Sequence, residues 1–250
     1  MFRVSIITPT TGKHFLKENI ESVRAQTYSN KEHIVVVDGY ERWEEADPIL
    51  KEIGFPSRSG NEHVCVLPYP TGIDRYNGHR VYGAATYFAD GNYHLWLDDD
   101  NMIEPNHVES MVNLIMEKDL HWAFSFRKII DKDGNFLCED NCESLGLWPS
   151  VLHPEDYFID VNCYMVHKAL AVNISPVWYR KFREPGQPEI DRVIAGTLMS
   201  TKNNLKFDST REYTVKYRVG NTSLSVQHEF FEKGNKTMLE KYNGKLPWKN

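Results

Sequence analysis

Apolar, β-branched runs alternate with amphipathic segments through the first half of this chain of 250 residues. Short apolar runs rich in Val and Ile predict buried strands, because such side chains pack well on a pleated surface. Strand and helix signals in alternation favour right-handed β-α-β units, and hence an α/β fold with a mostly parallel sheet. The expected strands are Val4–Thr8, His33–Val37, His63–Leu67, Tyr93–Leu97 and Trp122–Phe126.

Apolar residues at helical spacing predict helices between these strands and beyond them. The segment from Trp43 to Ile53 is only weakly helical, and we expect Pro48 to break it. In the second half we expect a hairpin over Phe124–Phe136 with its turn at Asp133-Gly134, and near the C-terminus only short strands. The other predicted elements are helices at Leu16–Gln26, Val81–Phe88, Val108–Ile115 and Asp191–Met199, a strand at Asp160–Val166 and a last helix near Glu229.

The composition is that of one globular domain. Hydrophobic residues make up 41% and charged residues 26% of the chain, and no linker rich in Pro, Ser or Gly divides it. We therefore expect residues 1–250 to form a single domain. The formal net charge of -6 argues against nucleic acid as a partner, since binding to a phosphate backbone needs a basic face. An anionic substrate would have to be held by a metal ion and by local basic side chains.

The sequence contains no apolar run that approaches the length of a membrane span. Because the first predicted strand begins at Val4, we see no signal peptide and expect a cytoplasmic protein. Such a protein could still contact a membrane peripherally. The glycosylation sequons at Asn173, Asn221 and Asn235 are then expected to be chance matches. In a reducing compartment the four cysteines are expected to be free thiols.

Three consecutive carboxylates follow the fourth strand, in the stretch Leu95-Trp96-Leu97-Asp98-Asp99-Asp100-Asn101. Ligands of open α/β sheets bind outside the carboxyl ends of the strands. Side chains alternate along a strand, so Asp98 and Asp100 are expected on one side and Asp99 on the other. Two converging carboxylates repel each other unless a cation lies between them, and such oxygen ligands suit Mg²⁺ or Mn²⁺ shared with substrate phosphates. The alternative is a solvated acidic turn.

Two stretches of the chain carry recognisable motifs, SIITPTTGKHFLKENIESVRAQTYSNKEHIVVVDG and GHRVYGAATYFADGNYHLWLDDDN, the second of which ends in an Asp-x-Asp motif. Together they resemble family 2 glycosyltransferases with the GT-A fold. The resemblance implies a mostly parallel central sheet with helices on both faces and a small additional sheet in the C-terminal half. It also implies a nucleotide-binding half over residues 1–104 and an acceptor-binding half over residues 105–250.

The resemblance implies roles for individual residues of the nucleotide-binding half. Asp38 would recognise the base, although an Asp before Gly39 is also typical of a turn. Asp98 and Asp100 would bind the ribose and a metal ion, Mn²⁺ or Mg²⁺, with Asp99 beside them in the nucleotide-sugar site. The loop along the base and ribose would be Thr8, Pro9 and Thr10, and contacts with the diphosphate or the donor sugar would come from Arg75, Asn77 and Arg80.

The stretch Glu189-Ile190-Asp191, followed by the apolar helix RVIAGTLM, resembles the family segment that holds the catalytic base, usually Glu-Asp. Ile190 interrupts the pair here, so the base would be either Asp191 or Glu189. Taken by itself, Asp191 is equally well explained as an acidic residue favoured by the helix dipole. His228 would be a late-chain metal ligand, as in some GT-A enzymes, or a histidine at the surface or at a helix start.

Other residues of the second half are open to two interpretations. Asp160 and Asn162 would line the acceptor side, or lie on the exposed face of a strand. Trp178, Tyr179 and Trp248 would stack on a sugar, or pack in the core, which is the usual fate of large aromatic side chains.

We therefore expect a metal-dependent glycosyltransferase that moves one sugar from a nucleotide-sugar donor to a hydroxyl of a carbohydrate or glycan acceptor. A metal ion would offset the charge on the departing diphosphate, and a carboxylate base would take the proton of the attacking hydroxyl. We expect the configuration at the anomeric carbon to be inverted. The resemblance favours UDP as the donor nucleotide, with GDP and dTDP open, and the lack of a Gln-x-x-Arg-Trp motif disfavours a processive synthase. The alternatives are a nucleotidyltransferase on a sugar phosphate, for which Thr8–Lys13 is a poor phosphate loop, and an inactive nucleotide- or carbohydrate-binding protein.

Overall fold

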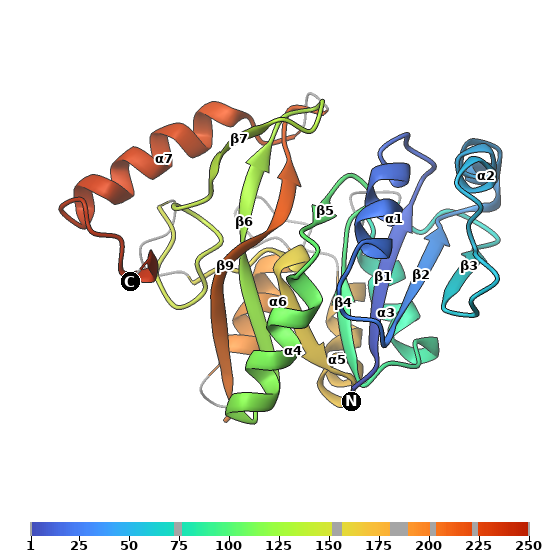
Figure 1. Ribbon diagram of the computed structural model, residues 1–250, viewed down its shortest axis with the longest axis horizontal. Coiled ribbons are helices and arrows are strands. Elements are labelled where there is room, and N and C mark those ends of the chain that lie inside the picture. The colour runs from blue at the N-terminus through green and yellow to red at the C-terminus, as the bar shows by residue number, and fades with distance from the viewer. Residues whose placement is uncertain are drawn as a thin grey trace.

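The computed structural model of the chain (Figure 1) describes residues 2–72, 77–151, 157–180, 190–200, 204–221 and 225–249. Within these ranges nine strands form one sheet, in the order β3-β2-β1-β4-β8-β6-β9-β5, and β7 pairs with β6 beside this path. The strands are β1 Val4–Thr10, β2 Lys31–Val37, β3 Glu62–Val66, β4 Tyr93–Trp96, β5 Met102–Ile103, β6 Trp122–Ile130, β7 Phe136–Glu139, β8 Tyr164–His167 and β9 Phe207–Arg218.

The first half of the sheet is parallel, as the sequence predicts. β1 lies between β2 and β4 and is parallel to both, and β3 is parallel to β2 on its outer side. All seven residues of β1 and six of β2 are buried, which explains why these strands have continuous apolar sequences. The four strands end at the same edge of the sheet, so Asp38 after β2 and Asp98 after β4 are brought to that edge.

The second half of the sheet mixes both strand directions. β8 is antiparallel to β4 and β6, β9 is parallel to β6, and β5 is antiparallel to β9. The additional strands therefore extend the main sheet, and the described residues do not form the separate small sheet that was expected. The hairpin of β6 and β7 is confirmed, with its turn closed by the backbone hydrogen bond from Asp131 to Asn135.

Two strand predictions in the second half are wrong. β9 is a single strand of 12 residues, not several short ones; it carries polar residues on an exposed face, and the positive φ of 58° at Arg211 interrupts its alternation. The strand expected from Asp160 begins at Tyr164, because the Asp160 side chain caps a short 3-10 turn over Val161–Cys163. Local side-chain bonds of this kind compete with strand formation.

Helices cover both faces of the sheet. In Figure 1, α1 and α4 lie in front of the strands, and α3, α5 and α6 lie behind them. Among the described ranges no helix is both long enough and apolar enough to cross a bilayer. The helices are α1 Leu16–Arg24, α2 Trp43–Glu52, α3 His79–Phe88, α4 His107–Lys118, α5 Lys168–Ile174, α6 Ile190–Met199 and α7 His228–Lys241.

Pro48 does not break the helix in which it lies. α2 runs through it without interruption, contrary to the sequence-based prediction. Pro48 removes one intrahelical hydrogen bond, but it lies on the exposed face of α2 where water can bind the freed carbonyl. On the opposite face Ala46 and Leu50 are buried in a cluster with Val35 and Val37 of β2, and this packing holds the helix in place.

Candidate active site

A cavity of about 670 Å³ lies at the carboxyl ends of β1, β2 and β4. The second half of the chain closes it, with residues from the 3-10 turn before β8, the start of α6, the end of β9 and the segment after β9. This is the edge of an α/β sheet where ligands bind. The residues that line it include Pro9, Thr10, Lys13, Asp38, Asn77, Tyr82, Asp98, Asp99, Asp100, Asp160, Asp191, Tyr217, Arg218 and Asn221.

Asp98 is held in the cavity by its backbone and by both oxygens of its carboxylate. Its backbone N–H donates to Asn162 Oδ1 (2.7 Å), and its Oδ2 accepts from Asn162 Nδ2 (2.9 Å). Its Oδ1 accepts a hydrogen bond from the hydroxyl of Tyr82 on α3. Burial, and then repulsion from Asp100, raise the pKa of Asp98 to about 7. A cation in the cavity would therefore stabilise the charged form of this carboxylate.

Asp99 faces the same cavity as its two neighbours, so the expected alternation of the three carboxylates is wrong. β4 ends at Trp96, and the chain turns at Asp99 and Asp100 instead of continuing as a strand. Asp99 Oδ2 accepts from Thr10 Oγ1 at 2.7 Å, which ties the end of β1 to the end of β4. Burial raises the pKa of Asp99, and the ammonium group of Lys13, 3.6 Å from Oδ1, opposes that rise.

Lys13 lies between two of the carboxylates. Its Nζ is 3.6 Å from Asp99 and 3.6 Å from Asp100. Burial alone would lower the pKa of Lys13, but the neighbouring carboxylates raise it above its ordinary value. Asp100 Oδ2 also accepts from Asn221 Nδ2 (2.6 Å), and the backbone carbonyl of Asp100 accepts from Arg218 Nε (2.9 Å). One cation therefore already offsets part of the negative charge of the cavity.

The donor set fits a divalent metal ion that is shared with a substrate. Asp98 and Asp100 both offer carboxylate oxygens to the cavity. In the part of the chain that the structure describes, no group of three or more His, Cys, Asp or Glu side chains is arranged to hold a metal ion. Mg²⁺ and Mn²⁺ are commonly bound by one or two carboxylates together with substrate phosphates, so two carboxylates are enough only if a phosphate completes the site.

Asp38 anchors the segment that follows β3. Its Oδ1 accepts from the backbone N–H and the hydroxyl of Thr71, both at 2.7 Å, and its Oδ2 accepts from the N–H of Gly72 at 2.8 Å. The chain turns at Gly39, whose φ of 113° favours glycine, and Pro70 lies against it. Asp38 therefore both shapes a wall of the cavity and lines it.

The loop residues predicted to contact a donor are placed differently from one another. Pro9, Thr10 and Asn77 line the cavity. Thr8 does not, because β1 extends to Thr10 and the Thr8 hydroxyl is buried 3.0 Å from Nε2 of His33. The two remaining residues are Arg80, which lies on α3, and Arg75. Arg80 is not among the residues lining the cavity and lies 3.5 Å from the carbonyl of Thr71, whereas Arg75 falls outside the described residues.

The acceptor side of the cavity contains one of the two candidate bases. Asp191 lies in the first turn of α6, is partly buried and lines the cavity. Glu189 falls outside the described residues. His228 begins α7 and is 3.7 Å from Glu232 on the same helix, and it is not among the residues lining the cavity. The structure thus brings Asp191, but not His228, into the cavity with the three consecutive carboxylates.

The tryptophans considered for sugar stacking are core residues. Trp178 is buried, with its ring 5.4 Å from Tyr82 and 5.8 Å from Trp96 between ring centroids. Trp248 is buried and donates from Nε1 to Asn141 Oδ1 at 2.8 Å. Tyr179 is exposed and does not line the cavity.

Sequence reasoning gave no role in the site to four residues that line the cavity, namely Lys13, Tyr82, Arg218 and Asn221. Arg218 and Asn221 reach Asp100 from more than 100 positions away, a separation over which a short motif gives no signal. Asn162 was considered for the acceptor side, but its amide binds Asp98 on the donor side.

Comparison with known proteins identifies the family. Residues 5–152, more than half of the chain, match the family described as Glycosyl transferase family 2. An uncharacterized glycosyltransferase of Rickettsia bellii is 30% identical over 206 residues, which cover 72% of this chain and 27% of that protein. The uncharacterized glycosyltransferase MJ1057 of Methanocaldococcus jannaschii is 24% identical over 256 residues, which cover 99% of this chain and 80% of that protein.

The fold matches that of a solved structure. The crystal structure of S. aureus TarS 1-349 in complex with UDP-GlcNAc superposes with a TM-score of 0.61 and 16% identity, over 96% of this chain and 66% of that chain. The chain spans just over a quarter of the length of the Rickettsia bellii relative. It belongs to family 2 of the glycosyltransferases and has the GT-A-like fold that the sequence predicts.

Proposed function

We propose that this glycosyltransferase transfers one sugar from a UDP-linked donor to a hydroxyl group of a carbohydrate acceptor with inversion, and that it needs Mn²⁺ or Mg²⁺. The observation that carries the proposal is one cavity lined by Asp98 and Asp100 at the end of β4 and by Asp191 at the start of α6. The resemblance of TarS, which was solved with UDP-GlcNAc, supports a UDP-linked donor. The family assignment argues against the nucleotidyltransferase alternative.

Residues of the N-terminal half would bind the donor. Asp38 would accept from a ring N–H of the base, next to the turn that it already holds. Asp98 and Asp100 would hold the metal ion, which supplies charge relief on the departing diphosphate when it is bound. Lys13, which is shared by Asp99 and Asp100, lies where its ammonium group would face the diphosphate. Because carboxylates outnumber basic side chains in the lining, a diphosphate would need the metal ion as well as Lys13 to balance its charge.

Asp191 would act on the acceptor. Its carboxylate would accept the proton of the acceptor hydroxyl as that oxygen attacks the anomeric carbon. The helix position supports this role, because α6 fixes Asp191 on the side of the cavity formed by the second half of the chain. A base on the face opposite the leaving diphosphate produces inversion at the anomeric carbon.

A thermal-shift panel tests the donor and the metal requirement together. UDP, GDP, dTDP and CMP are each added with and without Mn²⁺, since a ligand that binds only the folded state raises its stability. We expect UDP with Mn²⁺ to raise the melting temperature most. UDP release from UDP-glucose, UDP-galactose and UDP-GlcNAc is then measured with and without Mn²⁺. A preference for another nucleotide, or activity that is unchanged by chelation, would contradict the proposal.

A further inference from the structure

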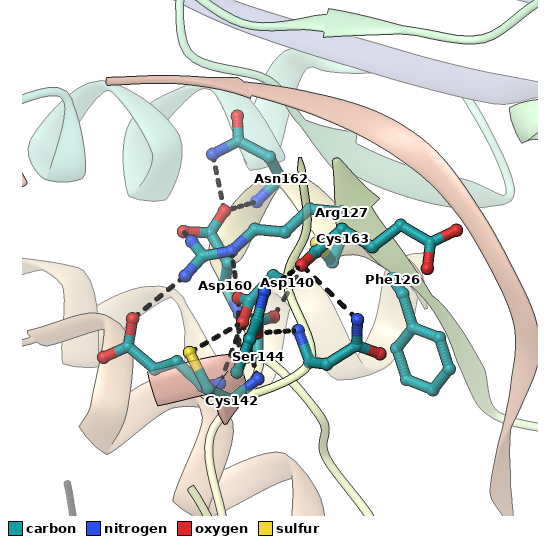
Figure 2. Close-up of polar contacts among 12 residues, drawn as sticks. Phe126, Arg127, Asp140, Cys142, Ser144, Asp160, Asn162 and Cys163 are labelled. Carbon is teal, nitrogen blue, oxygen red and sulfur yellow. Dashed lines mark hydrogen bonds and ion pairs between the residues drawn. The ribbon is translucent and has the colours of Figure 1, made fainter. Parts of the chain in front are cut away.

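A fully buried guanidinium lies next to the cavity without being part of its lining. Arg127 of β6 is 2% exposed. It donates to Asp160 Oδ2 at 2.6 Å and to Asp140 Oδ2 at 2.8 Å (Figure 2). It also donates to Glu143 Oε2 at 3.0 Å. Its planar face lies against the ring of Tyr217, 4.2 Å from the centroid. Each of the three guanidinium nitrogens therefore donates to a different carboxylate, and the planar group fixes the direction of each bond.

One of these carboxylates leads to the donor side of the cavity. Asp160 Oδ1 accepts from the backbone N–H of Asn162 (3.0 Å) and from its Nδ2 (2.7 Å). The same Nδ2 donates to Asp98 Oδ2 (2.9 Å), and Asn162 Oδ1 accepts from the N–H of Asp98 (2.7 Å). All hydrogen-bonding atoms of the buried amide are used, and only one orientation of the amide satisfies them. Arg127, Asp160 and Asn162 thus fix both the backbone and the carboxylate of Asp98.

A second carboxylate leads to the acceptor side. Glu143 Oε2 binds Arg127, and Glu143 Oε1 binds Nη2 of Arg192 at 2.6 Å. Arg192 lies in the first turn of α6, directly after Asp191, and its guanidinium lies over the ring of Phe158, 4.3 Å from the centroid. The first turn of α6 is therefore held to β6 through Glu143. The Asp191 backbone is set by the same contacts.

A buried cluster of this kind gives little stability by itself. Taking charges out of water is costly, and well-packed apolar residues can replace a buried ion pair with no loss of stability. A role in orientation accounts better for one guanidinium whose partners lead to both sides of one cavity. We infer that Arg127 is a positioning residue for sugar transfer: it orients Asp98 through Asp160 and Asn162, and the first turn of α6 through Glu143 and Arg192. The inference rests on the proposed function.

Four single variants test it. Arg127→Lys keeps the charge but loses the planar fork, Asn162→Ala cuts the donor side, and Arg192→Gln cuts the acceptor side. The matched control is Arg24→Lys, because Arg24 makes a similar fork with Glu62 (2.7 and 2.9 Å) away from the cavity. For each protein we would measure the Kd of UDP at fixed Mn²⁺ by calorimetry, kcat and KM for UDP release from the best UDP-sugar, and the melting temperature.

The expected results separate positioning from stability. Asn162→Ala raises the Kd of UDP with Mn²⁺ by about tenfold or more, because Asp98 loses two oriented hydrogen bonds. Arg192→Gln lowers kcat by about tenfold or more and leaves the Kd of UDP unchanged. Arg127→Lys does both. Arg24→Lys lowers the melting temperature but leaves the Kd and kcat at wild-type values.

Each contrary outcome has its own meaning. If Arg127→Lys lowers the melting temperature and otherwise behaves like Arg24→Lys, Arg127 is a structural residue and the inference is overturned. If Arg127→Lys does not fold, Asn162→Ala and Arg192→Gln still decide, because both keep Arg127 and its three carboxylates; wild-type values in both overturn the inference. Wild-type protein that fails to bind UDP with Mn²⁺ would instead overturn the proposed function, and the inference with it.

Discussion

Asp99 and Asp100 both lie near the ammonium group of Lys13, but they differ in burial and in their other hydrogen bonds. Asp99 is buried and bonded to Thr10, whereas Asp100 has a more exposed side chain, which favours Asp100 as the metal ligand. We expect Asp100→Asn to raise the half-saturating Mn²⁺ concentration for UDP binding by about tenfold or more, through loss of an anionic ligand. Asp99→Asn should have a smaller effect. Calorimetric UDP titrations at stepped Mn²⁺ concentrations measure both, and equal effects would contradict the pairing of Asp98 with Asp100.

Asp191 acts on the chemical step if it is the base. We expect Asp191→Asn to lower kcat for UDP release by roughly 100- to 10,000-fold, the usual contribution of general base catalysis. The Kd of UDP with Mn²⁺ should stay unchanged, since Asp191 lies on the side formed by the second half of the chain. Glu189→Gln is the rival variant. Loss of activity in Glu189→Gln with an active Asp191→Asn would move the base to Glu189, and activity in both would call for the anomeric configuration of the product to be read by NMR.

At the scale of elements, Asp38 joins the end of β2 to the segment after β3. Its three hydrogen bonds to Thr71 and Gly72 would suffice to explain a purely structural residue. If Asp38 also binds the base, Asp38→Ala should weaken UDP binding by about 1.5–3 kcal/mol, the range for a hydrogen bond to a charged group. Thr71→Val removes one of the anchoring bonds and keeps the carboxylate. Equal Kd values for the two variants would show that Asp38 only anchors the segment.

Two glycines test how tightly the segment between β7 and β8 packs on the sheet. Gly146 and Gly134 both have positive φ, 62° and 85°, so an alanine costs about 1–2 kcal/mol at either position. A Cβ on Gly146 would lie 2.5 Å from Phe124 and 2.9 Å from Ile159, whereas the nearest group to a Cβ on Gly134 is Arg218 at 3.9 Å. Gly146→Ala should therefore lose about 1–3 kcal/mol more than Gly134→Ala. Urea denaturation measures the free energy of unfolding of both variants. Similar losses would mean that the segment between β7 and β8 shifts to accommodate the added methyl group.

At the scale of the whole molecule, the sequence predicts what depends on local patterns. The parallel half follows from apolar runs such as His33–Val37, and Asp98 is found because it ends such a run. The contacts that complete the cavity could not be found in this way. Asn221 binds Asp100 across 121 positions and Asn162 binds Asp98 across 64, distances over which neither periodicity nor a short motif gives a signal. Thr8 was misplaced because the end of a strand is set by pairing with its neighbours, and β1 pairs with β2 as far as Thr10.

Buried histidines make the stability of the whole molecule sensitive to acid. Burial lowers the pKa of His33 and of His107 to about 3, and that of His94 to about 4. Because the folded-state pKa is below the unfolded value of about 6.5, the unfolded chain binds more protons between these values, and stability falls as the pH drops through that window. Each such histidine contributes a slope of up to about 1.4 kcal/mol per pH unit. His107→Gln should reduce the slope of the unfolding free energy by about that amount between about pH 6 and 4, as measured by urea denaturation. An unchanged slope in His107→Gln would show that His107 is protonated in the folded protein.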